Sequence, residues 1–352
     1  MKNTVCWIYI LVLAFLSVYE VMSTSPSFIS SKKINRKLFY LMSIILTCIY
    51  FFRDPMSGVD DGSYYSNWFL YNNSFNEIIR DIVIPGHDGG FKLIFELCKI
   101  FSKSYWFACT VVYLLTLIPL YIFILRKSKY QMLSLFIYLC YYWGASVVLH
   151  RMALCLTLGL VAWMNIDDNK NIRALFFALL AASIHISGWI ILGYFLIKKI
   201  PQKKMGYVIF YLMLIAVVIS EIVIPWLVAY YRDGSYVKEL SYNGGWVFFL
   251  LLCIISIFLN IISKYYLKQK TNAYAYNTIA MATVLQIFAF QLSLIVRAVY
   301  LYFIQIIIAI PNCIFYIKNR ETKNIILIVL IVFSLIWLWY TGEELNSMRW
   351  IV

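Results

Sequence analysis

The sequence predicts an all-α, polytopic integral membrane protein, and two observations lead to that prediction. Of the 352 residues, 63% are hydrophobic and only 13% are charged, whereas soluble proteins have roughly 25% charged residues. The apolar residues also come in long unbroken runs rather than in amphipathic stripes, and runs of about 18 or more predict helices that span a bilayer. We therefore expect one transmembrane domain over residues 1–352, without a water-soluble domain.

About ten transmembrane helices account for the apolar runs. The expected spans, in chain order, are residues 4–22, 38–52, 104–125, two within 130–165, 206–231, 246–263, two within 273–317, and 324–340. At about 1.5 Å of rise per residue, 130–165 and 273–317 are each too long for a single crossing. They are predicted to turn on the external side, near Gly144 and near Ser293 respectively.

Clusters of Lys and Arg between the runs set the expected orientation, because these residues accumulate in cytoplasmic loops. Lys32, Lys33 and Arg36 follow the first run, so the N-terminus is expected outside. Residues 53–103 then form a large external loop that carries an amphipathic helix, and residues 232–245 form a second external loop. Polar chemistry is expected mainly in the first of these loops.

The segment 172–197 is long for one crossing and short for two. Lys170 before it and Lys198 after it place both of its ends on the cytoplasmic side. It is therefore expected to be a re-entrant or broken helical segment that turns around His185 and Gly188. The alternative is a single tilted span, which would reverse the sidedness of every later loop.

The net charge of +14 does not predict a nucleic-acid partner. Lys and Arg lie in short clusters between apolar runs, and no basic stripe on a polar domain is present to follow phosphates. The eight cysteines are scattered and form no C-x-x-C pair, which predicts neither a disulfide framework nor a metal site. No glycine-rich nucleotide loop, H-E-x-x-H or G-x-S-x-G element indicates nucleotide, zinc or serine-hydrolase chemistry.

Arg151 and Arg297 each lie at the outer end of an inward-running apolar helix. A guanidinium in a spanning segment costs roughly 2.5–3.5 kcal/mol on insertion scales and is rare without a purpose. Arginine stays charged when desolvated and binds phosphate oxygens through two parallel hydrogen bonds. Snorkelling to the lipid headgroups explains either side chain alone equally well. The matched pair instead predicts a common anion site on the external side.

Further candidates come from the predicted helix break and from the external loop. His185 lies at the break, where a packing role and a functional role are equally expected. The loop candidates are Arg53, Asp60, Tyr64, Tyr65, Trp68 and His87. A solvated loop position is the simpler explanation for any one of them, although loops held by a rigid scaffold commonly carry function.

Five short elements follow one another along the chain. They are Arg53 with Gly58, Asp60 and Tyr64; His87 to Phe91; Arg151 with Ala153; His185 with Ser187; and Arg297 with Tyr300 and Phe303. This ordered set resembles the EpsG-like branch of the Wzy-type polysaccharide polymerases. Two departures from that pattern are Met152, where the family often has glutamine, and the lack of a glutamate before the glycine-aromatic element.

The resemblance implies a GT-C-like polymerase of the bacterial inner (cytoplasmic) membrane that serves lipopolysaccharide or exopolysaccharide synthesis. Such an enzyme would join undecaprenyl-pyrophosphate-linked oligosaccharides, as donor and acceptor, into O-antigen at the periplasmic face. It would be a glycosyltransferase without metal or cofactor, in contact with membrane lipid and with a chain-length regulator protein as a further partner. The alternatives are an O-antigen ligase and a lipid-linked oligosaccharide flippase.

The resemblance also implies roles for individual residues. Arg151 and Arg297 are expected to hold the donor pyrophosphate, with Arg53 assisting. Asp60 or His185 is expected to orient or deprotonate the acceptor hydroxyl. The residues expected to contact the rest of the substrate are Tyr64, Tyr65, Trp68, His87 and Tyr300.

Overall fold

The computed structural model describes residues 4–23, 29–57, 61–71, 73–84, 86–223, 245–261, 270–290 and 294–341. The long elements of these ranges are α-helices, and the described residues include no β-strand, which confirms the all-α prediction. The expected second external loop, 232–245, lies outside the described residues apart from its last residue, Gly245.

The α-helices are α1 (Thr4–Ser23), α2 (Ile29–Phe51), α3 (Asp61–Tyr64), α4 (Phe75–Val83), α5 (Gly89–Phe101), α6 (Tyr105–Lys127), α7 (Gln131–Val148), α8 (His150–Asp167), α9 (Asn171–Ile184), α10 (Gly193–Lys199), α11 (Gln202–Val218), α14 (Gly245–Ile261), α16 (Lys270–Ala289), α17 (Leu294–Phe303), α18 (Ile306–Tyr316) and α19 (Arg320–Thr341). Three short elements join them: the π-helical turn η1 (Tyr65–Phe69), the 3₁₀ segment η2 (Ile186–Leu192) and the π-helical turn η3 (Ile219–Val223).

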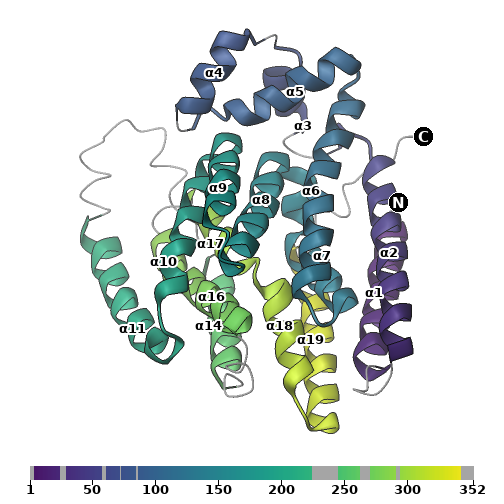
Figure 1. Ribbon diagram of the computed structural model, residues 1–352, viewed down its shortest axis with the longest axis vertical. Helices are drawn as coiled ribbons and strands as arrows, with labels where there is room; N and C mark the ends of the chain where they lie inside the picture. Colours follow the sequence, from purple (N-terminus) through teal and green to yellow (C-terminus); the bar gives the residue numbers. More distant parts are fainter. Residues whose placement is uncertain are drawn as a thin grey trace.

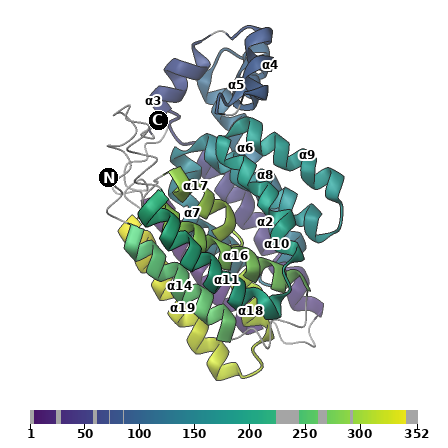
Figure 2. The same ribbon diagram turned by 90° about the vertical axis from the view of Figure 1, so that its left-hand side faces the viewer.

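The long helices form a bundle, and α3, α4 and α5 gather at one end of it (Figures 1 and 2). We call the pair α4 and α5 the cap. In the apolar segment Ile295–Tyr316, which runs through α17 and α18, 89% of the residues in the most apolar stretch are buried, against 22% in α19. Helices α17 and α18 therefore lie inside the bundle, and α19 lies on its outside.

The outside of the bundle is apolar, as a lipid-facing surface must be. Five described helices are long and apolar enough to cross a membrane: Thr4–Ser23, Ile34–Phe51, Tyr105–Lys127, Ile295–Tyr316 and Arg320–Thr341. Large side chains such as Phe15, Ile336 and Trp339 are exposed on these helices. In water so much exposed apolar surface is unfavourable, whereas lipid accepts it. The polytopic membrane architecture is confirmed.

The turn predicted near Gly144 is wrong in position. Helix α7 continues past Gly144 to Val148, and the break falls at Leu149, whose φ of −100° and ψ of 67° are not helical. Glycine weakens a helix by only about 1 kcal/mol relative to alanine, so a well-packed bundle holds it in helical geometry. The other turn is predicted near Ser293, which lies outside the described residues, between α16 and α17.

Ion pairs bring together the helix ends that the sequence assigns to the cytoplasm. Lys127 at the end of α6 donates to Asp167, the last residue of α8, at 2.6 Å and to Asp168, which follows it, at 2.7 Å. Lys198 in α10 donates to Asn169 at 2.8 Å, in the same region. The start of α9 and the end of α10 therefore lie close together. The chain enters the bundle along α9 and returns along η2 and α10. The broken segment is confirmed, and the single tilted span is excluded.

The chain reverses its direction around His185 and Gly188, as the sequence predicts. Helix α9 ends at Ile184, and His185 is extended, with φ −152° and ψ 135°. The N–H of Gly188 donates to the carbonyl of His185 at 2.8 Å. A Cβ on Gly188 would lie 2.4 Å from backbone atoms of Ala181 and Ala182, so only glycine allows η2 to fold this closely onto α9.

Candidate functional site

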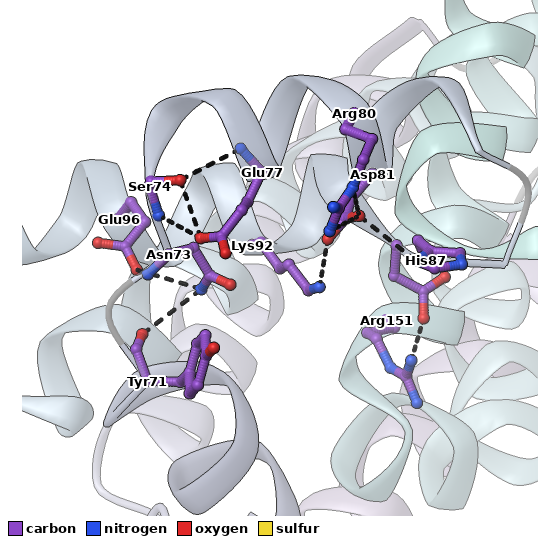
Figure 3. Close-up of polar contacts among 11 residues, drawn as sticks. Tyr71, Asn73, Ser74, Glu77, Arg80, Asp81, His87, Lys92, Glu96 and Arg151 are labelled. Carbon is purple, nitrogen blue, oxygen red and sulfur yellow. Dashed lines mark hydrogen bonds and ion pairs between the residues drawn. The ribbon is translucent and has the colours of Figure 1, made fainter.

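The cap meets the bundle at an ion pair between Arg151 and Asp88. Arg151 is the second residue of α8, and Asp88 precedes the first turn of α5. Nη1 of Arg151 donates to Oδ2 of Asp88, and the two side chains are 25% and 8% exposed. Figure 3 shows the Arg151 guanidinium below the cap. The charge that the sequence places in an apolar helix is thus partly buried and paired, rather than snorkelling into solvent.

Two aromatic rings lie against the same guanidinium. Cζ of Arg151 lies 4.6 Å from the ring centroid of Trp68 and 5.4 Å from that of Tyr64. Lys92 of α5 approaches the Trp68 ring at 5.6 Å. Cation–π contacts of this kind hold a guanidinium in place, and the Tyr64 side chain also forms a hydrogen bond with Arg151. Asp88 is thus the anion that the held guanidinium binds in this structure.

Arg297 lies beside His185 at the helix break. Nη1 of Arg297 is 3.4 Å from Nε2 of His185, and Nδ1 of His185 accepts the backbone N–H of Ser187 at 3.1 Å. A neutral imidazole that accepts at Nδ1 carries its proton on Nε2. Nε2 of His185 and Nη1 of Arg297 are then both donors and face one another. Two facing donors leave a place for an acceptor such as a phosphate oxygen.

The two arginines belong to one electrostatic environment. The positive charges of Arg151, Arg297 and Lys92 each act to lower the pKa of the Asp88 carboxyl. Both arginines also act on His185. Burial raises the pKa of the Asp88 carboxyl above its ordinary value, although Arg151 and Arg297 act to lower it. The segments that carry Asp88, Arg151, His185 and Arg297 are distant in sequence and converge here; we call these four residues the arginine cluster.

Arg53 belongs to a second, fully buried cluster. Nη2 of Arg53 donates to Asp61 at 2.6 Å, and Nε2 of His150 lies 3.2 Å from the other oxygen of Asp61. The hydroxyl of Tyr113 lies 3.3 Å from the same His150 nitrogen. The His150 ring stacks on Tyr64 at 5.2 Å, with 14° between the planes. Arg53 is thus not brought to Arg151 but lies behind Tyr64, and this buried network fixes the ring that touches Arg151.

The other predicted site residues are dispersed. Asp60 lies outside the described residues. Tyr65 packs on Tyr105 at 5.2 Å, at the root of the cap. Tyr300, one turn after Arg297 on α17, packs on Phe248 at 5.4 Å. None of these described contacts reaches the arginine cluster directly.

His87 faces the cap instead of the arginines. Its Nδ1 lies 3.3 Å from Asp81, and its side chain is 51% exposed. Arg80 and Lys92 point at the same Asp81 carboxylate, Lys92 at 2.6 Å (Figure 3). Burial tends to raise the pKa of Asp81, but the hydrogen bond and charge of Lys92 outweigh it, so this pKa lies below its ordinary value. Asp81 joins the two helices of the cap.

Sequence reasoning missed the roles of Asp88 and Asp61. Each lies in a loop that contains several carboxylates, and its partner is far along the chain, so spacing alone could not select it.

The described residues contain no group of three or more His, Cys, Asp or Glu side chains placed to hold a metal ion. Metal independence therefore stays a prediction.

The fold and the arginine cluster define a class: a polytopic membrane protein with a partly buried cationic site at one end of its helix bundle. A family model described as the EpsG family matches residues 36–351, nearly the whole chain. The protein therefore belongs to the EpsG family, which is a family of Wzy-like polysaccharide polymerases. No curated protein and no solved structure matches the chain.

Proposed function

We propose that the protein polymerises oligosaccharide repeat units carried on undecaprenyl pyrophosphate, at the periplasmic face of the bacterial inner membrane. The product would be an O-antigen or a related exopolysaccharide. The EpsG family supports the polymerase activity in general terms. The arginine cluster supports a pyrophosphate-linked donor, because arginines bind phosphate oxygens.

The convergence of Arg151 and Arg297 is the observation that carries this proposal. When a sugar leaves a lipid pyrophosphate, the departing oxygen gains negative charge. Cations and N–H donors fixed in a partly dry site stabilise that charge without reorganising during the reaction. Two arginines with the Nε2–H of His185 supply such donors. A diphosphate has enough oxygens to engage both guanidinium groups at once.

The Trp68 ring next to Arg151 suits the sugar beside the pyrophosphate. It borders the guanidinium and is partly exposed, and a flat ring stacks well on the apolar face of a sugar. Tyr64 is buried against His150 and would hold Arg151 in place.

Tyr65 and His87, which lie outside the arginine cluster near the cap, would contact more distant sugar units. Tyr300 lies one turn deeper in the bundle than Arg297 and packs on Phe248. Arg53 would act indirectly, because its buried network with Asp61 and His150 holds Tyr64.

The reaction needs one bond to form and one to break. The oxygen of the acceptor hydroxyl attacks the anomeric carbon of the donor sugar, and the bond from that carbon to the pyrophosphate oxygen breaks. The electron pair stays on the lipid pyrophosphate, where Arg151 and Arg297 stabilise it. The acceptor proton must pass to a base, for which Asp60 is the candidate from the sequence. His185 would act as a donor to phosphate.

In vitro polymerisation by the purified protein tests the proposal. Defined units linked to undecaprenyl pyrophosphate should give a ladder of products, with and without a chelator. Arg151→Ala and Arg297→Ala should each abolish the ladder, because the leaving group loses its stabilisation. Arg320→Ala is the matched control, since Arg320 is exposed at the start of α19, and it should retain activity.

Two results would count against the proposal. A normal ladder from either Arg151→Ala or Arg297→Ala would reject the assigned pyrophosphate site. Transfer of the glycan only to a different acceptor lipid, without chain growth, would instead assign a ligase reaction.

A further inference from the structure

Asp88 is held in place by the backbone on both sides of it. It has a positive φ of 52°, which Asp and Asn adopt more readily than most residues. A Cβ on Gly89 would lie 2.3 Å from the backbone nitrogen of Ile82, so α5 begins in close contact with α4. A Cβ on Gly90 would lie 2.3 Å from Oγ of Ser183, two residues before His185. The carboxylate is thus fixed between the cap and the helix break.

Asp88 differs in chemistry from the other members of the arginine cluster. Arg151 and Arg297 are permanent cations that only donate. His185 accepts the Ser187 N–H at Nδ1, so its Nε2 carries a hydrogen and donates. Among the described residues of this cluster, the Asp88 carboxylate is therefore the group able to accept a proton near the donor pyrophosphate.

The position of Asp88 also sets the order of events. The carboxylate accepts from Nη1 of Arg151, one of the donors that a pyrophosphate would use. Donor pyrophosphate and Asp88 therefore compete for Arg151. Once Arg151 is engaged elsewhere, the attraction that lowers the pKa of Asp88 is lost, while burial still raises that pKa. The displaced carboxylate is a stronger base than the paired one.

Resting on the proposed function, we infer that donor pyrophosphate displaces Asp88 from Arg151, and that Asp88 then takes the proton from the acceptor hydroxyl. When the proton leaves, the electron pair of the O–H bond stays on the acceptor oxygen, which forms its bond to the anomeric carbon. The proton goes to Oδ of Asp88, and the electron pair of the broken glycosidic bond leaves on the lipid pyrophosphate. The arginines thus hold the base until the donor arrives.

Asp88→Asn separates the two parts of this inference, because Asn has nearly the same shape and tolerates a positive φ. Binding of undecaprenyl pyrophosphate should be at least as tight as in the unaltered protein, since no carboxylate competes for Arg151. Polymer formation should fall about 100- to 10,000-fold, the usual contribution of a general base. Asp168→Asn, at the opposite end of the bundle, is the matched control and should leave polymer formation unchanged.

Wild-type rates from Asp88→Asn would overturn the inference. So would loss of pyrophosphate binding together with the rate, because Asp88 would then only hold Arg151 in place. If Asp88→Asn does not fold, Asp88→Gly with added formate decides the matter, since glycine accepts the positive φ and leaves room for a small carboxylate. Recovery of polymer with formate supports the base, and no recovery rejects it.

The same assay separates this inference from the proposed function. If the unaltered protein makes no polymer, the proposed function fails. If the unaltered protein makes polymer and Arg151→Ala does not, the function stands whatever the Asp88 variants do.

Discussion

His150 and Arg151 are neighbours in sequence but serve different clusters. Successive side chains on an α-helix point about 100° apart, so the first turn of α8 sends His150 to Asp61 and Arg151 to Asp88. The divergence of the two side chains follows from helix geometry alone. The identity of their partners does not, because Asp61 and Asp88 come from a loop whose path depends on the packing of the cap.

Arg53 and Arg151 should respond differently to truncation. Arg53→Ala removes the cation that pairs with the fully buried carboxylate of Asp61, and breaking such a buried pair costs about 3–5 kcal/mol. We expect a clearly lower melting temperature for Arg53→Ala, measured by circular dichroism in detergent. Arg151→Ala should melt closer to the unaltered protein, because Arg151 is partly exposed. Equal melting temperatures for Arg53→Ala and the unaltered protein would contradict the structural role given to Arg53.

At the same scale, the sequence singles out charged residues by their cost in an apolar helix. That argument selected Arg151 and Arg297, the predicted helix break selected His185, and the structure places all three in one cluster. It could not select Asp88, since a loop carboxylate carries no such cost. Nor could it separate Arg53 from the other arginines, because burial at the end of α2 depends on contacts with α6 and α8.

At the scale of elements, charge clusters predicted that both ends of the broken segment lie on the same membrane face. Local residues did not predict where α7 ends. Lys170 and Lys198 bracket a segment whose two ends must share one membrane face, and this holds whatever the packing inside. The end of α7 at Leu149 depends instead on how α7 packs on its neighbours. Gly144 is too weak a helix breaker to decide it.

Gly188 controls the geometry of the break. A Cβ at this position would collide with the backbone of α9 at 2.4 Å, so Gly188→Ala should push η2 and His185 away from Arg297. We expect this variant to insert into the membrane but to lose most polymer formation. Gly62→Ala is the control, because nothing lies within 4 Å of a Cβ there. Equal activity of the two variants would contradict the need for this close reversal.

The cap should loosen in acid. The pKa of Asp81 is lowered in the folded protein, with Lys92 as the main partner opposing the effect of burial. A lowered carboxyl pKa stabilises the fold above the unfolded value of about 3.9, and the effect is lost as the pH falls through the folded value. Hydrogen exchange of α4 amides, corrected for intrinsic rates, should therefore quicken below about pH 4.

Lys92→Met provides the comparison for this pH effect. Without the cation, the pKa of Asp81 should return toward its ordinary value, and α4 protection should be lower already at neutral pH. Unchanged α4 protection in this variant at every pH would show that the cap does not depend on the pair.

At the scale of the whole molecule, the cap and the Lys127–Asp167 contacts lie at opposite ends of the bundle, so they should face opposite compartments. Ser66→Cys, on η1, and Lys170→Cys, before α9, place an exposed thiol at each end. In spheroplasts, a membrane-impermeant maleimide should label Ser66→Cys, and Lys170→Cys only after permeabilisation. The unaltered protein gives the background of native cysteines. Reversed labelling would contradict the orientation.

The sequence also accounts for much of the architecture at this scale, because hydropathy and basic clusters report directly on burial in lipid and on sidedness. The order of the long helices follows from those two signals. The meeting of Trp68, Asp88, Arg151, His185 and Arg297 at one point does not. It requires the bundle to bring five distant segments to the same end, which only tertiary packing decides.

The central claim is that Arg151 and Arg297 jointly hold one diphosphate, and relative affinity for two lipids tests it most directly. The measurement compares the binding of undecaprenyl pyrophosphate with that of undecaprenyl monophosphate, for the unaltered protein and for Arg151→Ala and Arg297→Ala. The unaltered protein should prefer the pyrophosphate. Each variant should lose about tenfold or more of that preference, as expected for a charge-assisted hydrogen bond. A full preference for pyrophosphate in either variant would contradict the claim.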